Sequence, residues 1–330
     1  MLHFAVDGSA LTMNSIILVL RDSNMKDSSK LHSNKDESPG FLRGALMWRG
    51  SVTPRIFPSL LLMTCYCLLI VALDQYWRPL SHLAVTPFEY TGVVLGLVLV
   101  FRTNTGHERW WEARKLWGGI NNQSRNLVIQ ALNYSKGFND DPQESLWREE
   151  MVKWTVAFSF ATRESLRNSK NLDDLTDVLI PQELDALKSA GHMPLFVASK
   201  IAFLLQQARF GHHIDGFVFE KLEGQRILLI DHIGGCERIL KTPMPLVYAI
   251  KARRFIFIFL LLLPFSLIEN LGFSAVFIYF LVAYPLLSLD RIGIELQNPF
   301  DTKNLSHLPL HSICDSIKIH CLALLEQPKT

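Results

Sequence analysis

The chain has 330 residues, of which 49% are hydrophobic and only 19% are charged, and its 33 basic and 31 acidic residues leave a formal net charge of +2. So small a basic excess argues against a nucleic-acid-binding protein, which needs a positive surface to meet phosphates. The five cysteines show no zinc-finger or redox spacing, so we expect no disulfide framework and no cysteine-based metal site.

The first 40 residues differ from the rest of the chain. The apolar patch from Ile16 to Leu20 is too short to cross a bilayer, and no basic residue precedes it as a secretory signal would require. Residues 21–39 are polar and nearly free of apolar side chains. Such a segment cannot bury enough surface to offset its chain entropy, so we expect residues 1–40 to form a disordered N-terminal tail.

Four apolar segments then predict four transmembrane helices, at about residues 56–73, 87–103, 252–269 and 272–289. The first and the last are uncharged over nearly the ~30 Å of a hydrocarbon core, at ~1.5 Å per residue. The second is apolar only from Tyr90 to Phe101, and it continues without a proline into a charged stretch. We therefore expect one long helix that begins in the membrane and leaves it.

Between the second and third segments, apolar residues recur at helical spacing, as in the pairs Leu127/Ala131 and Ile201/Leu205, and nothing alternates like a strand. This pattern predicts a helical cytoplasmic body over residues 104–250, with residues 311–330 as a C-terminal cytoplasmic helix or tail. The predicted fold class is an all-α integral membrane protein with four transmembrane helices and a helical cytoplasmic domain.

Lysine and arginine placement predicts the orientation of these helices. Basic residues gather at 43–55, 102–115 and 251–254 and at Arg291, whereas the opposite turns, 74–86 and 269–271, hold one arginine between them. We expect a multi-pass protein of the cell membrane with both termini in the cytoplasm.

Val93, Leu97 and Phe101 form one stripe on the second helix, because they recur every four residues. Two interpretations are open from spacing alone. The stripe is either an ordinary packing face or, if several subunits surround an axis, a set of stacked apolar rings that gate a pore by dewetting.

Polar clusters elsewhere give little sign of chemistry. His212-His213 with Asp215, and Asp173-Asp174, match no metal-ligand pattern, so we expect no metal and no cofactor. No phosphate-binding loop or nucleophile motif occurs either, so nothing predicts an enzyme.

The chain resembles the bestrophin family, especially its bacterial and plant members, over roughly residues 41–310. The resemblance rests on four stretches: RGSVTPRIFPSLL (49–61), FRTNTGHERWWEARKLWGG (101–119), GGCERILKTPMPLVY (234–248) and NPFDTKNLSHLPL (298–310).

The resemblance implies a homopentameric channel with the second helix of each subunit lining a narrow neck. Counting back from Arg109 of the Arg-Trp-Trp block places the neck at Val93, Leu97 and Phe101, which favours the pore interpretation of the stripe. It also implies a cytoplasmic constriction near Phe217, with Ile214 as the alternative.

Animal members of the family bind calcium through an acidic cluster after Asn-Pro-Phe. The corresponding residues 301–306 here contain one carboxylate, Asp301. Calcium takes six to eight oxygen ligands, so we expect no calcium site of that type.

The expected function is passive conduction of chloride or a similar anion. A cation-permeable channel of the same fold and a non-conducting membrane scaffold are the alternatives. A secondary transporter is disfavoured, because no inverted repeat is visible and no charge lies within the apolar runs 56–73, 90–101, 255–268 and 272–289.

Overall fold

The computed structural model describes residues 41–48, 50–77, 79–81, 83–135 and 142–326, so the expected disordered tail lies outside the described residues. Its described part contains helices and no strand, which confirms the all-α prediction there. The chain divides into two compact units, Met1–Ser51 and Val52–Thr330. The described part of the first holds the short helix α2 (Phe41–Ala45).

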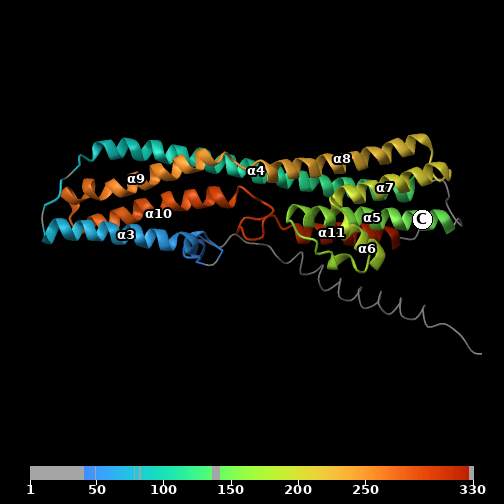
Figure 1. Ribbon diagram of the computed structural model, residues 1–330, viewed down its shortest axis with the longest axis horizontal. Helices are drawn as coiled ribbons and strands as arrows, with labels where there is room; N and C mark the ends of the chain where they lie inside the picture. The colour runs from blue at the N-terminus through green and yellow to red at the C-terminus, as the bar shows by residue number, and fades with distance from the viewer. Residues whose placement is uncertain (1–40, 49, 78, 82, 136–141, 327–330) are drawn as a thin grey trace, which may run out of the picture. The chain divides into compact units, whose positions relative to one another are not determined.

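The second unit contains the remaining described helices (Figure 1). In chain order they are α3 (Thr53–Tyr76), α4 (Thr86–Asn133), α5 (Pro142–Leu166), the 3-10 turn η1 (Asp173–Leu175), α6 (Pro181–Ser189), α7 (Met193–Phe210), α8 (Gly216–Lys241), α9 (Leu246–Leu271), α10 (Ser274–Glu295) and α11 (Leu310–Glu326).

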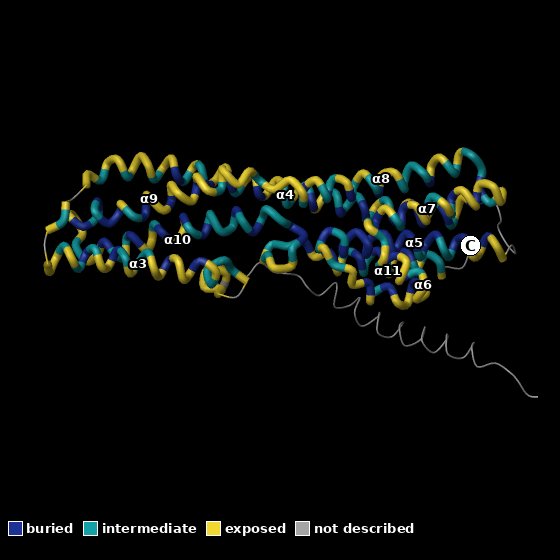
Figure 2. Tube along the Cα trace, in the orientation of Figure 1, coloured by how far each residue is buried: buried dark blue, intermediate teal, exposed yellow. Residues whose placement is uncertain are grey.

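One hydrophobic cluster joins α3, the N-terminal half of α4, α9 and α10, and we call it the four-helix cluster. Leu60, Leu99 and Tyr279 lie at its centre. Many residues of these helices are exposed, as the yellow parts of the tube show (Figure 2), and they include many large apolar side chains. By length and composition, α3 and α10 are the helices of the described chain that could cross a bilayer.

The break between α9 and α10 depends on one glycine. Gly272 ends α9 with a φ of +51°, in a region that side chains with a Cβ rarely adopt. The chain can therefore turn sharply here, and α10 begins at Ser274, two residues after the start expected for the fourth segment.

Helix α4 passes from the four-helix cluster to a second and larger cluster (Figure 1). It runs unbroken for 48 residues, as the absence of proline between Pro87 and Pro142 predicts. In its second half it packs against α8. There Gly119 faces the His232 ring and Gly235 faces the Leu116 side chain, so two glycines allow the helices to approach closely.

The larger cluster contains α5, α7, α8, α11 and the second half of α4. Helix α5 lies at its centre and is buried along most of its length, as its dark trace in Figure 2 indicates. Phe158 and Phe160 of α5 and Trp117 of α4 are among its largest fully buried side chains.

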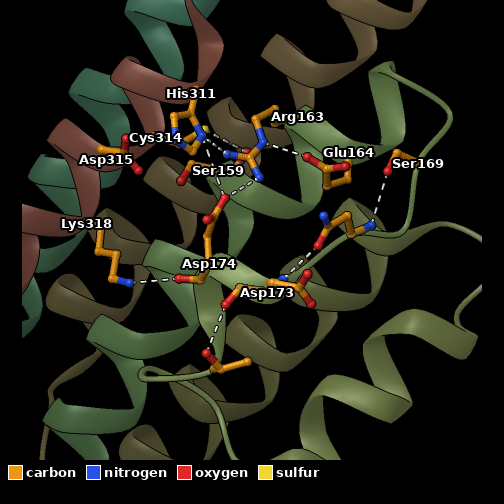
Figure 3. Close-up of polar contacts among 12 residues, drawn as sticks. Ser159, Arg163, Glu164, Ser169, Asp173, Asp174, His311, Cys314, Asp315 and Lys318 are labelled. Carbon is orange, nitrogen blue, oxygen red and sulfur yellow. Dashed lines mark hydrogen bonds and ion pairs between the residues drawn. The ribbon is translucent and has the colours of Figure 1, made fainter.

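Polar contacts attach the C-terminal helix α11 to this cluster (Figure 3). The buried guanidinium of Arg163 donates to Glu164 at 2.6 Å, to Asp174 at 2.8 Å and to Nδ1 of His311 at 2.9 Å. Lys318 donates to the Asp174 carbonyl at 2.7 Å. Together these contacts join α5, η1 and α11.

Candidate functional site

Val93, Leu97 and Phe101 are exposed on one side of α4, with 74%, 54% and 57% of their surfaces accessible. The buried residues of the same part of the helix, among them Leu95 and Leu99, face the four-helix cluster. The described part of the chain therefore leaves the stripe largely uncovered. Three large apolar side chains remain free to contact another subunit, lipid or a pore axis.

The buried side of α4 fits closely against α10 at the end of its apolar part. A Cβ on Gly106 would lie 3.1 Å from Cβ of Leu296, so this position has little room for a larger side chain. One turn earlier Arg102 is fully buried and forms an ion pair with Asp290 of α10. These contacts fix how α4 sits on α10.

Arg109 connects three backbone segments through its guanidinium. It donates to the carbonyls of Ile239 at 2.6 Å and Thr242 at 2.8 Å, at the C-terminal end of α8. A longer contact of 3.4 Å reaches the Gln297 carbonyl after α10. A cation at a helix C-terminus meets carbonyls that have no partner within the helix and the negative end of the helix dipole.

Burial lowers the pKa of Arg109, and the nearby charge of Glu112 opposes that shift. An arginine nonetheless keeps its charge in proteins, so all of its N–H groups stay available as donors.

The Arg-Trp-Trp block and the Asn-Pro-Phe block meet in space although they are far apart in sequence. Nε1 of Trp110 donates to the Ser306 carbonyl at 2.7 Å. Within the second block, the Asn304 amide donates to the Asn298 carbonyl at 2.9 Å, and Oδ1 of Asp301 accepts from the Lys303 backbone at 2.9 Å. The loop is thus held by the protein's own donors and acceptors.

Two further contacts attach this loop to the ends of α3 and α10. Arg55 of α3 donates to the Lys303 carbonyl at 2.6 Å and forms an ion pair with Glu295. Glu295 is almost fully buried, and its second oxygen accepts from the Leu305 backbone at 2.8 Å. A single carboxylate therefore holds both an arginine and the loop.

The polar clusters considered as metal sites have structural partners. Asp215 caps the N-terminus of α8 by accepting from the Val218 backbone at 2.8 Å, and Asp174 binds Arg163. Across the described ranges, no group of three or more His, Cys, Asp or Glu side chains is placed to hold a metal ion.

The two residues named for a cytoplasmic constriction lie in different environments. Phe217, in the first turn of α8, is 82% exposed, whereas Ile214 is fully buried in the larger cluster. A buried side chain offers no surface to an ion path, so this placement favours Phe217.

A cavity of about 410 Å³ lies between α4 and α9. Its lining is almost wholly apolar, with Val94, Val98, Phe255 and Phe259 among the side chains and Thr91 as the one hydroxyl. Such a lining suits an apolar group and offers an ion almost no ligand.

Sequence reasoning missed the pairs Arg102–Asp290 and Arg55–Glu295. A signal for the first was present. Arg102 directly follows one apolar run and Asp290 directly follows another, so both charges are expected where their helices reach the same membrane face.

A family model described as a bacterial/fungal bestrophin protein matches residues 33–323. The chain belongs to this bestrophin family. Among curated bestrophin relatives, a voltage-dependent anion channel-forming protein of Nostoc sp. is 34% identical over 83% of this chain and 88% of its own length. The protein of the same description from Synechocystis sp. is 31% identical over 86% of this chain and 91% of its own length.

A crystal structure of a bacterial bestrophin homolog from Klebsiella pneumoniae has the same fold. Its TM-score with this chain is 0.75 at 28% identity, and the match covers 83% of this chain and 100% of that one. The fold predicted from the four sequence stretches is therefore confirmed at the level of the bestrophin family.

Proposed function

We propose that this bestrophin is a passive anion channel of the cell membrane, in which several copies surround an axis lined by α4. The observation that carries the proposal is the stripe of Val93, Leu97 and Phe101, which is exposed on a helix whose opposite side is buried. The description of the curated relatives as anion channel-forming proteins supports the choice of anions.

The proposed topology has four spans, formed by α3, the first part of α4, α9 and α10. Helices α3 and α10 have the length and composition of a span. In α9 the chain is uncharged from Phe255 to Ile268. The apolar part of α4 is shorter, and its exposed apolar surface is suited to contact with other copies as well as lipid. The basic helix ends favour a cytoplasmic location for both termini and for the larger cluster.

The stripe acts as the neck in this proposal. Five copies, the number that the family resemblance implies, would stack three apolar rings along the axis. Apolar rings narrow enough to exclude water impede ions without any charged group, and widening them admits water. The rings do not select the sign of the ion, which must come from charges or backbone dipoles at the two ends. Phe217 is the proposed second constriction.

Single-channel recording of purified protein in a planar bilayer under a KCl gradient tests the function. We expect the reversal potential to shift toward the chloride equilibrium potential. A shift toward the potassium potential would replace anion by cation conduction, and silence of correctly assembled protein would favour a non-conducting scaffold.

The neck assignment has its own test in the triple variant Val93→Ala, Leu97→Ala, Phe101→Ala, which should raise the open probability by widening the rings. Leu62→Ala with Leu69→Ala on α3 is the matched control, because it also removes exposed apolar side chains, but from a helix outside the proposed neck. Equal effects of the two variants, or no effect of the triple variant, would contradict the assignment.

A further inference from the structure

The ion pair of Arg102 lies directly beside the proposed neck. Arg102 follows Phe101 in sequence, and at 3.6 residues per turn the two side chains point about 100° apart around α4. Phe101 is 57% exposed whereas Arg102 is fully buried. Whatever fixes Arg102 against its neighbour therefore also fixes the direction in which Phe101 points.

Asp290 of α10 is the partner that fixes Arg102. Arg102 is fully buried and the Asp290 side chain is 15% exposed, and Nε and Nη2 of Arg102 have no hydrogen-bond partner among the described residues. The aliphatic part of Arg102 lies over Gly293, whose added Cβ would be 3.5 Å from Cγ of the arginine. Separating a buried guanidinium from its one counter-ion is strongly unfavourable in free energy, because it leaves a buried charge uncompensated.

Asp290 also joins a third helix. Its second oxygen lies 3.2 Å from Nε of Arg253 in α9. The hydrophobic effect that packs α4 against its neighbours is non-directional, so by itself it selects no particular rotation of the helix. The ion pair is specific to one rotation, because turning α4 by one residue would carry Arg102 about 100° away from Asp290.

We propose that Arg102 is a positioning residue of the neck, which holds α4 at the rotation that keeps Phe101, Leu97 and Val93 directed at the pore axis through its ion pair with Asp290. This inference rests on the proposed function of the stripe. It adds that the closed neck is maintained by a charge pair on an adjoining side of the same helix, about 100° around from Phe101.

Arg102→Met tests the role, since the apolar substitute keeps much of the side-chain volume and Asp290 retains Arg253 as a partner. Without the ion pair, α4 can rotate and turn Phe101 away from the pore axis, which opens the apolar ring that the copies of Phe101 form. The ratio of open to closed channels should then rise by at least about fivefold, the lower end of typical coupling effects. Arg291→Met is the matched control. Arg291 pairs at 2.9 Å with Glu295 of its own helix and not with α4, and Glu295 keeps Arg55 as a partner when Arg291 is replaced.

The decisive comparison repeats Arg102→Met in the Val93→Ala, Leu97→Ala, Phe101→Ala background. If Arg102 acts by aiming the neck side chains, its effect on open probability should disappear once those side chains are gone. An equal effect in both backgrounds, or none in either, would overturn the inference. If the pentamer of Arg102→Met fails to assemble, Arg102→Lys is compared in the same two backgrounds, with a smaller change expected only where the neck is intact.

This experiment distinguishes failure of the proposed channel function from failure of the positioning role of Arg102. A wild-type assembly without current refutes the proposed channel, and the positioning role with it. A conducting wild type whose triple-alanine variant behaves as expected, but whose Arg102→Met variant gates normally, refutes the positioning role alone.

Discussion

At the scale of single residues, the junction between the two clusters is built from side chains that bind backbone carbonyls. Arg109 binds the end of α8, and Trp110 binds the loop that follows α10. Arg55 binds the same loop from α3. Backbone carbonyls at helix ends and in loops have no helical partner, so a rigid multi-donor group satisfies several of them at once.

Replacing Arg109 by lysine keeps the positive charge, but it should still lower the free energy of unfolding. An ammonium on a flexible stem cannot reproduce the fork that reaches Ile239 and Thr242 together, so we expect a loss of about 1–3 kcal/mol in unfolding free energy. Denaturant unfolding of the detergent-solubilised protein measures it. Arg238→Lys is the control, because Arg238 is largely exposed beside Glu112 and should change stability by less than about 1 kcal/mol.

Ile214 and Phe217 should respond oppositely to truncation. Ile214→Ala leaves a cavity in the larger cluster and should lower the unfolding free energy by about 2–4 kcal/mol. Phe217→Ala removes an exposed ring, so it should leave subunit stability nearly unchanged and instead alter single-channel conductance. Unchanged conductance of Phe217→Ala would remove Phe217 from the proposed ion path.

At the scale of elements, α4 and α8 depend on the small residues between them. Gly235 leaves room for Leu116, since an added Cβ would lie 2.9 Å from both of its methyl carbons. Gly224, also within α8, has open space around it. Gly235 is therefore required by close packing whereas Gly224 is not, although both glycines have the same poor helix propensity.

Alanine substitutions at these two positions should distinguish the effect of helix propensity on stability from the effect of close packing. Gly224→Ala should raise the melting temperature, because alanine in a helix interior is favoured over glycine by about 0.5–1 kcal/mol. Gly235→Ala gains the same propensity but forces Leu116 to move, so it should be the less stable of the two. Thermal unfolding by circular dichroism compares them, and equal stabilisation would argue against a tight contact.

The attachment of α11 should weaken in acid. The hydrogen bond from Arg163 lowers the pKa of Asp174, while partial burial opposes the shift. A carboxyl with a lowered folded pKa contributes stability that is complete above its unfolded value, near about 4, and is lost as the pH falls through the folded pKa.

The stability difference between the wild type and Asp174→Asn should consequently stay constant from neutral pH down to about 4 and shrink below it. Melting temperatures across that range measure the difference. Asp185→Asn, at an exposed carboxyl of α6, is the control. A difference that grows in acid would contradict the assigned role of Asp174.

At the scale of the whole molecule, the loop after α10 is attached through the protein's own donors and acceptors. Its one carboxylate, Asp301, accepts from the Lys303 backbone, and the Asn304 amide satisfies the Asn298 carbonyl. Glu295, Arg55 and Trp110 supply further attachments. We therefore expect the order of this loop not to depend on calcium.

Currents through the reconstituted channel should be the same in a calcium chelator and in millimolar calcium. The physical reason is that six to eight oxygen ligands are needed for calcium and the loop offers one carboxylate, already engaged. Magnesium at equal concentration controls for screening of surface charge. Currents that disappear on chelation and return with calcium alone would refute this expectation.

Much of this bestrophin followed from sequence because its signals are local. Uncharged runs place helices, the lack of a proline predicts a continuous α4, and a spacing of four residues puts Val93, Leu97 and Phe101 on one side of it. Each of these inferences depends on the period of a helix or on the cost of a charge in an apolar medium, which a one-dimensional pattern records.

Only the tertiary structure decided which distant residues meet. It pairs Arg102 with Asp290, brings Trp110 to Ser306, and separates buried Ile214 from exposed Phe217. A buried charge shows in sequence only as a charge, because its partner is selected by how helices pack and rotate against one another. That packing is a property of the folded chain. The sequence pattern therefore predicts the helices, and the tertiary fold determines which of their residues are in contact.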